Sequence, residues 1–233
     1  MKQLNVISGG AAQGLVGQLS ERFAADHGFR PQGTFGAVGL MKDKLLAGAP
    51  CDVVILTAAL IQELEQQGYV VPGSARALGV VRTGVAVKAG EPKPEVGTPQ
   101  ALAGLLRSAA GIYFPDPVKA TAGIHFMKVL RTLGLDQELA DRFRPFPNGA
   151  TAMREMAAAS GDGLVGCTQV TEILYTPGVQ LAGVLPSVFE LATVYVAAVC
   201  IRSPDPVAAQ SLVDLLAADA SRTQRLAGGF EEQ

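Results

Sequence analysis

The residues with the clearest chemical potential are small or polar, and they stand where strands are expected to end. Ser8, Gly9 and Gly10 follow the apolar run LNVI and precede a helical pattern. In a strand–turn–helix unit, the first free N–H groups of the helix point into the turn, and the helix dipole adds partial positive charge. The stretch therefore predicts an anion pocket, although Gly9 and Gly10 would equally serve only to make the turn.

Further candidates of the same kind follow other expected strands or begin other expected helices. Glycine lets ligand oxygens approach the backbone, and Ser, Thr, Asn and Gln supply directional neutral hydrogen bonds. This set comprises Ala37, Val38, Thr57, Thr121, Ala122, Gly123, Asn148, Gly149, Ala150, Thr168 and Gln169. Asn148 also suits the N-cap of the helix that follows it, and capping alone would explain its presence.

Two ionisable residues join these candidates. His125 stands in the first turn of the helix expected in TAGIHF, where it would serve either as a base or as a structural residue. Arg82 interrupts the apolar strand GVVRTGVAV. It would either form an ion pair between lobes or clamp a ligand carboxylate. The sequence leaves both pairs of alternatives open.

The apolar pattern predicts the elements that would position these residues. Residues 4–8 and 51–57 have the pattern of buried strands, and residues 14–28 and 38–48 that of amphipathic helices. A second series of helices and strands begins near residue 98. Such alternation predicts mostly parallel sheets with helices on both faces. Ligands of these sheets bind outside the carboxyl ends of the strands, where the candidate residues fall.

Two long apolar strands divide the chain into two expected lobes. The strand at residues 78–90 would leave the first lobe, and the strand at residues 190–202 would return to it. We therefore predict a two-lobe α/β fold with mostly parallel sheets and a ligand cleft between the lobes. Lobe 1 would comprise residues 1–83 and 190–233, and lobe 2 residues 84–189.

The composition excludes several partners. The chain has 233 residues, of which 48% are hydrophobic and 17% charged, so it can bury a substantial core. Its 19 basic and 21 acidic residues give a net charge of −2, without a basic cluster, which argues against a nucleic-acid partner. No apolar stretch approaches the roughly 20 residues that membrane insertion requires. The start MKQLNVISGG lacks the pattern of a secretory leader. We therefore expect a cytoplasmic location, or a periplasmic one if a leader has been removed.

Nucleotide and metal chemistry find no support in the sequence. The stretch GGAAQGLV lacks the Lys-Ser/Thr pair of a P-loop, and a dinucleotide fingerprint would need glycine where Ala11 stands. Cys51, Cys167 and Cys200 lack metal-ligand spacing. Cys51 and Cys200 lie in apolar runs, which predicts that both are buried. We expect neither a metal nor a cofactor.

Four blocks together resemble the molybdate-binding component of ABC transporters, a type II periplasmic binding protein. They are NVISGGAAQGLVGQLSERF, TFGAVGLMKDKLLAGAPCDVVIL, FPDPVKATAGIHFMKVLRTLGL and GLVGCTQVTEI. The resemblance covers essentially the whole chain and implies the two-lobe fold. It implies an oxyanion held by Ser8, by backbone amides near Ala122 and at residues 148–150, and by side chains at positions 38 and 169.

Two of those positions depart from the family pattern. The resemblance implies a serine where Val38 stands and a tyrosine where Gln169 stands. Loss of a hydroxyl donor leaves one oxygen of a tetrahedral oxyanion against apolar surface, at a cost of about 1–3 kcal/mol. We therefore expect a small organic anion with one or more carboxylates as the ligand. An ABC permease is the partner expected if the chain is exported.

The chain also resembles a subset of this family that includes aconitate isomerase, an enzyme on a binding-protein scaffold. This resemblance implies an alternative function, the cofactor-independent movement of a C=C bond in a tricarboxylate. His125 would then be the base, and Ser8, Thr168 and helix N–H groups would stabilise the developing enolate.

Overall fold

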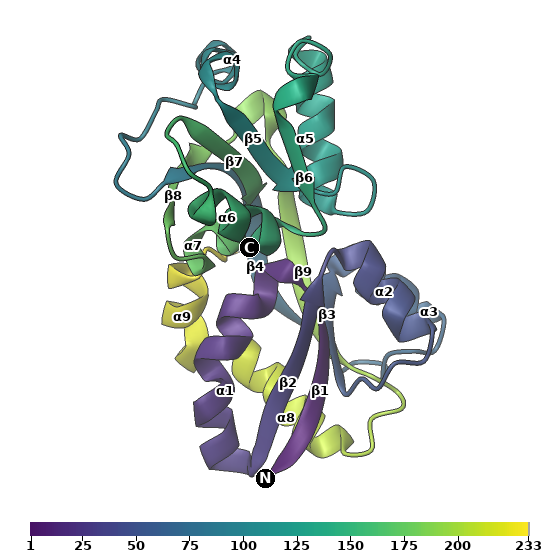
Figure 1. Cartoon of the computed structure of the whole chain (residues 1–233). Coiled ribbons are helices and arrows are strands. Elements are labelled where there is room, and N and C mark those ends of the chain that lie inside the picture. Colours follow the sequence, from purple (N-terminus) through teal and green to yellow (C-terminus); the bar gives the residue numbers. More distant parts are fainter. Residues whose placement is uncertain (233) are drawn as a thin grey trace. The chain divides into compact units, whose positions relative to one another are not determined.

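The computed structural model describes residues 1–232, which form two units. Unit 1 joins Met1–Val81 to the segment that begins at Thr193, and unit 2 is Arg82–Ala192. The long strand β4 (Arg76–Lys88) contains the first boundary between them (Figure 1). Among the described residues, no helix has the length and apolar character that a bilayer-spanning segment requires.

Unit 1 is built on a sheet in which three strands run parallel. β1 (Lys2–Gly9) lies between β2 (Phe29–Gly36) and β3 (Val53–Thr57), and β9 (Ala192–Val199) runs antiparallel to β3. β3 is fully covered, because Val53, Val54, Ile55 and Leu56 each show 0% exposure. A continuous apolar strand of this kind is typical of a sheet with both faces packed.

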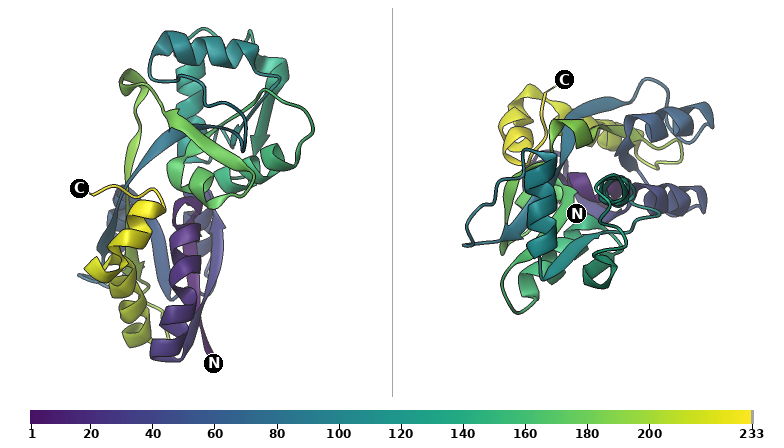
Figure 2. Two further views of the ribbon diagram at one scale, coloured as in Figure 1. Left: turned by 90° about the vertical axis from the view of Figure 1, so that its left-hand side faces the viewer. Right: turned by 90° about the horizontal axis from the view of Figure 1, so that it is seen from above.

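Helices cover both faces of this sheet, as the alternation of elements predicts. α1 (Gln13–His27), α8 (Pro206–Ala217) and α9 (Arg222–Ala227) lie on one face, and α2 (Val38–Leu46) and α3 (Ala58–Gln66) lie on the other (Figures 1 and 2). α1 ends at Gly28, whose φ of 73° is a left-handed conformation that glycine adopts without strain. Cys51 and Cys200 are buried in this unit, which confirms the prediction for them.

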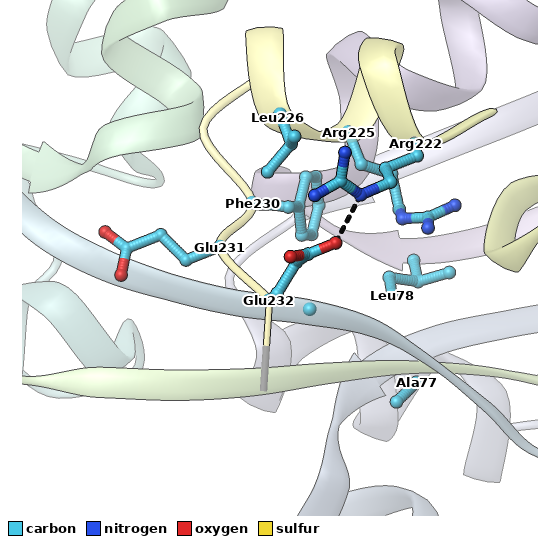
Figure 3. A pocket seen from close by; sticks show the side chains of 9 residues that line it. Ala77, Leu78, Arg222, Arg225, Leu226, Phe230, Glu231 and Glu232 are labelled. Carbon is cyan, nitrogen blue, oxygen red and sulfur yellow. Dashed lines mark hydrogen bonds and ion pairs between the residues drawn. The ribbon is translucent and has the colours of Figure 1, made fainter. Parts of the chain in front are cut away.

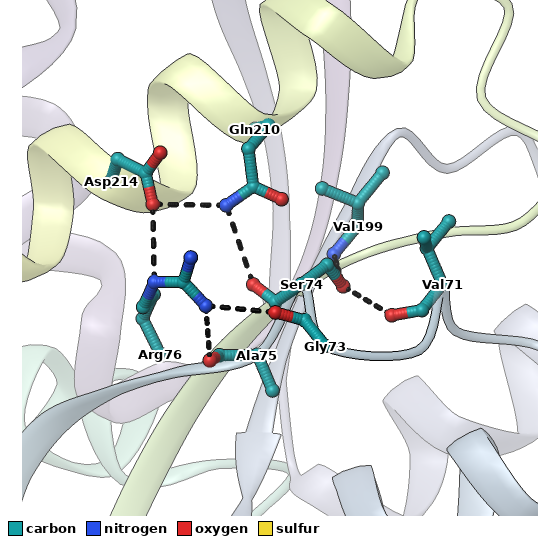
Figure 4. Close-up of polar contacts among 8 residues, drawn as sticks. All are labelled: Val71, Gly73, Ser74, Ala75, Arg76, Val199, Gln210 and Asp214. Atoms are coloured by element: carbon teal, nitrogen blue, oxygen red, sulfur yellow. Dashed lines mark hydrogen bonds and ion pairs between the residues drawn. The ribbon is translucent and has the colours of Figure 1, made fainter.

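A polar network attaches the start of β4 to α8 within unit 1 (Figure 4). Asp214 accepts from Gln210 Nε2 at 2.9 Å and pairs with Arg76 Nε at 3.3 Å. Ser74 Oγ donates to Val71 O at 2.7 Å and accepts from Val199 N at 3.1 Å. These bonds fix the segment that precedes β4.

Unit 2 contains a second sheet with a parallel centre. β5 (Gly111–Pro115) lies between β6 (Phe143–Phe146) and β7 (Leu164–Gln169), and both neighbours are parallel to it. β4 runs antiparallel to β7 on one side and to β8 (Val179–Val184) on the other. Residues 143–146 form the edge strand of this sheet, where Pro145 lacks an N–H without breaking a central ladder.

Two core layers cover the opposite faces of this second sheet. α4 (Pro99–Ser108) and α5 (Thr121–Thr132) pack on the row that contains Val165 and Cys167. α6 (Gly149–Ala158) and α7 (Val170–Tyr175) pack on the row that contains Leu164. Alternate residues of β7 therefore face different helices. Short 3₁₀ helices lie at Gly10–Ala12, Ala140–Arg142, Ser187–Phe189 and Asp219–Ser221.

Candidate functional site

In unit 1 the end of β1 lies against the start of α2. Ser8 is fully buried, and its Oγ donates to Gly9 O at 2.8 Å. A Cβ on Gly9 would come within 2.8 Å of Val38 Cγ1 and 3.0 Å of Tyr195 Cε1. Because Gly9 has a φ of −56°, which any residue can adopt, this close approach rather than turn geometry requires the glycine.

The other expected residues of unit 1 surround this contact. Ala37 is the N-cap of α2, and Val38, which is 8% exposed, is its first residue. Thr57 ends β3 and is the register partner of Tyr195 on β9. Gly10 begins the 3₁₀ turn that follows β1. Tyr195 was not predicted from the sequence, where its signal is a lone tyrosine in an apolar strand.

In unit 2 the start of α6 lies against the end of β7, and a buried carboxylate joins them. Asn148 Oδ1 accepts from Thr151 N at 2.8 Å, so Asn148 is the N-cap of α6. Glu172 is 5% exposed, and its oxygens accept from Thr168 Oγ1 at 2.5 Å and from Ala150 N at 3.3 Å. A Cβ on Gly149 would overlap both Thr168 Oγ1 and the Glu172 carboxylate. The glycine therefore makes room for this pair.

Burial and hydrogen bonding shift the pKa of Glu172 in opposite directions. Burial raises the pKa of its carboxyl group above the usual range, because desolvation disfavours the charged form. Hydrogen bonds from Thr168 and from the amides of Ala150, Gln169 and Gly149 oppose that shift. The amides at residues 149–150, which the resemblance assigned to the ligand, thus contact an internal carboxylate. Glu172 was not predicted from the sequence, although an acid within the apolar stretch VTEIL is a visible signal.

The start of α5 presents a different arrangement. Thr121, Ala122 and Gly123 form its first turn, and within the described chain the N-cap Ala120 provides no side-chain hydrogen bond to them. Gly123 packs on the backbone at the end of β5, where a Cβ would overlap the carbonyl oxygens of Pro115 and Asp116. The first-turn amides and the helix dipole together make this end of α5 suited to an anion.

His125 lies one turn into α5 and contacts the backbone of a distant segment. Its Nε2 lies 2.7 Å from Phe189 O. A carbonyl oxygen only accepts, so this bond places the proton on Nε2 and leaves Nδ1 of the neutral ring as an acceptor. The ring is therefore oriented by a structural contact and keeps one basic nitrogen.

Arg82 and Gln169 differ in the polar contacts of their side chains. Arg82 forms an ion pair with Glu190, which belongs to the same unit, and the two side chains are 36% and 37% exposed. Gln169 ends β7, is 3% exposed, and is the register partner of Thr83 on β4. Within residues 1–232, no hydrogen-bond partner reaches either atom of the Gln169 amide or the Thr83 hydroxyl.

A surface pocket of about 200 Å³ in unit 1 is lined by none of these residues (Figure 3). It lies between the start of β4 and α9, and Leu78 and Phe230 line it. Its Arg222 forms an ion pair with Glu232, which raises the pKa of Arg222 and lowers that of Glu232. The charge of Arg222 is thus partly neutralised. Across the described residues, no three His, Cys, Asp or Glu side chains are grouped to hold a metal ion.

Comparison with known proteins places this geometry in a family. The model of the bacterial extracellular solute-binding protein family matches residues 4–231. Aconitate isomerase of Pseudomonas sp is 25% identical over 222 residues, which cover 92% of this chain and 82% of that protein.

Solved structures agree on the fold. The periplasmic molybdate-binding protein of Azotobacter vinelandii superposes with a TM-score of 0.81 at 20% identity, and 99% of each chain is covered. The sulfate-binding protein SubI of Mycobacterium tuberculosis H37Rv gives a TM-score of 0.75 at 17% identity, covering 100% of this chain and 87% of that one. The predicted resemblance and fold class are confirmed. A family match over nearly the whole chain shows that this protein belongs to the bacterial extracellular solute-binding proteins.

Proposed function

We propose that this chain binds a small organic anion with one or more carboxylates. The observation that carries the proposal is Glu172, whose carboxylate lies on the α6 amides. A fully ionised inorganic oxyanion needs such amides as free donors, and here the Glu172 carboxyl group already accepts from Ala150 N. An organic acid can place its carboxylates elsewhere and present carbon or hydroxyl groups at this point.

The start of α2 supports the same ligand class. Val38 offers methyl groups where the resemblance implied a serine hydroxyl, and the Ser8 hydroxyl donates to its own neighbour's carbonyl. An apolar side chain at a helix start suits the carbon skeleton of an organic acid better than an oxygen of molybdate or sulfate. Membership in the solute-binding family further supports periplasmic delivery of the ligand to an ABC permease.

Thermal shift and calorimetry against molybdate, sulfate, citrate, cis-aconitate and trans-aconitate test this proposal. Binding stabilises the native state by about 2.7 kcal/mol at a ligand concentration 100 times Kd. We expect at least one organic acid to raise the Tm and neither inorganic anion to do so. In Val38→Ser, molybdate binding should improve relative to wild type. Stabilisation by molybdate or sulfate alone would overturn the proposal.

A second experiment tests the expected ligand residues one at a time. We expect Ser8→Ala and Gln169→Leu each to weaken binding of the acid. Thr132→Val, at the far end of α5, is the matched control, because its exposed hydroxyl bonds only to Lys128 O at 2.9 Å within the described structure. A variant that binds the acid as tightly as wild type does would remove its residue from the proposed site.

Isomerisation of a tricarboxylate is the second candidate function, favoured by the aconitate isomerase relative and by the geometry of His125. Nδ1 would remove a proton from the carbon next to the double bond, giving a delocalised enolate. The imidazolium would return the proton to the far carbon of that system, so the double bond moves and no atom is gained or lost. Phe189 O would hold the Nε2 proton throughout.

Deuterium exchange separates the two functions. Proton NMR of cis- and trans-aconitate in D₂O with the protein should show exchange and interconversion if the chain is an isomerase. His125→Gln should abolish both, and His27→Gln, the other histidine of the chain, should leave them unchanged, since its exposed ring stacks on Phe23. Binding of aconitate without any exchange would identify a binding protein alone.

A further inference from the structure

Two facing residues of unit 2 leave three buried polar atoms without hydrogen bonds. Among residues 1–232, Gln169 Nε2, Gln169 Oε1 and Thr83 Oγ1 have no partner, and the two side chains are 3% and 1% exposed. Thr83 and Gln169 are register partners on the antiparallel strands β4 and β7. Directly opposite residues of such a pair project from the same face of the sheet. The three atoms therefore form one polar spot.

The alternation of each strand shows which face carries this spot. Val165 and Cys167 on β7 belong to the core beneath α5, and Gln169 continues their row. On β4, Val85 belongs to the same core, and Thr83 continues its row. Thr168 lies between Cys167 and Gln169 along β7, so its side chain points to the opposite face of the sheet, where it contacts Glu172.

The start of α5 belongs to the same face. Phe126, one turn beyond the first-turn residues 121–123, packs in the core that contains Val165 and Cys167. The uncapped amides of α5 and the Thr83–Gln169 pair thus lie on one side of the sheet. This face of the sheet offers two kinds of hydrogen-bond donor, the first-turn amides of α5 and Gln169 Nε2. It also offers one acceptor, Gln169 Oε1.

The chemistry of these atoms identifies what they can bind. An unpaired polar group in a buried position is costly, so a partner outside the chain is favoured. A primary amide presents one donor group and one acceptor, and a threonine hydroxyl can do either. An ionised oxyanion only accepts, so it would leave Gln169 Oε1 unpaired. A carboxylate with a neighbouring hydroxyl satisfies both halves of the amide.

We propose that Thr83 and Gln169 form a subsite for a hydroxy acid, in which the ligand's hydroxyl accepts from Thr83 Oγ1 and donates to Gln169 Oε1. Gln169 Nε2 and the first-turn amides of α5 then bind the adjacent carboxylate. This inference rests on the proposed function and narrows its ligand class. It adds Thr83 to the binding residues and makes the pair a determinant of specificity.

Matched acids that differ by one hydroxyl test the subsite directly. Citrate and tricarballylate share three carboxylates, and malate and succinate share two, while only the first of each pair carries a hydroxyl. By calorimetry, we expect wild type to prefer the hydroxy member of at least one pair by about tenfold or more. Thr83→Val and Gln169→Leu should reduce that preference to within about threefold. Thr83→Ser, which keeps the hydroxyl, and the control Thr132→Val should retain it.

The possible failures are distinguishable. If wild type binds both members of each pair equally, the subsite is refuted while the carboxylate-binding function stands. If no organic acid binds at all, the proposed function itself fails. If Gln169→Leu does not fold, as judged by circular dichroism, the wild-type pairs and Thr83→Val still decide the question.

Discussion

Thr168 Oγ1 donates a 2.5 Å hydrogen bond to the carboxylate of Glu172, and both side chains are buried at the end of β7. Glu172 also accepts from Ala150 N, so one carboxylate joins β7, α7 and the start of α6. This buried acid therefore links three elements of unit 2 beside the candidate residues.

The raised pKa of Glu172 predicts a pH-dependent stability. Its folded-state pKa lies above its unfolded value, so the native state holds the proton more tightly. The stability that this proton contributes is fully present below the unfolded pKa and is lost as pH rises through the folded pKa. We expect Glu172→Gln to gain stability relative to wild type as pH increases from about 4.5, the usual glutamate range.

Urea unfolding of both proteins between pH 4 and pH 8 measures this difference. Glu155→Gln, an exposed position on α6, is the control and should show no such trend. A difference between Glu172→Gln and wild type that is independent of pH would contradict the prediction.

Gly149 is predicted to tolerate no larger residue. Gly149→Ala would force its Cβ against Thr168 Oγ1 and the Glu172 carboxylate, and we expect a loss of about 1–3 kcal/mol in the free energy of unfolding. Gly104→Ala in α4 is the matched control. It meets no atom within 4 Å and should stabilise by about 0.5–1 kcal/mol through the helix backbone. Equal effects of the two substitutions would show that Glu172 and Thr168 can move aside.

Asp52 is predicted to be a structural acid of unit 1. It is 2% exposed and accepts from Asn5 N at 2.6 Å, from Asn5 Nδ2 at 3.2 Å and from Ser203 Oγ at 2.6 Å. Asp52→Ala leaves Asn5 N and Asn5 Nδ2 without their acceptor. We therefore expect a loss of about 2–3 kcal/mol in the free energy of unfolding. Ser203→Ala removes only one of these bonds and should cost about 1 kcal/mol. Denaturant unfolding would contradict this account if Ser203→Ala were the more damaging change.

The ion pair of Arg82 with Glu190 is predicted to contribute little to stability. Both side chains are more than one-third exposed, and such pairs are worth about 0–1 kcal/mol. We expect Glu190→Gln to lower the free energy of unfolding by less than about 1 kcal/mol, with a smaller effect at 1 M salt. A larger, salt-independent loss would show that the pair is effectively shielded from solvent.

The local pattern of residues in the sequence was sufficient to predict most of the helices and strands. The continuous run VVIL predicted a strand covered on both faces, and Gly28 predicted the end of α1, because both effects depend on neighbours in the chain. The edge strand at residues 143–146 was missed. Its FRPF sequence contains a proline, and only pairing with β5 makes it a strand.

The sequence by itself determined the family resemblance, the order of elements and the residue types at the strand ends. Only the tertiary structure decided which polar groups are already engaged. Ala150 N donates to Glu172, 22 residues away, and His125 contacts Phe189, 64 residues away. The Thr83–Gln169 pair likewise arises from register between distant strands. Hydrogen bonds between distant residues depend on packing, which no local pattern encodes.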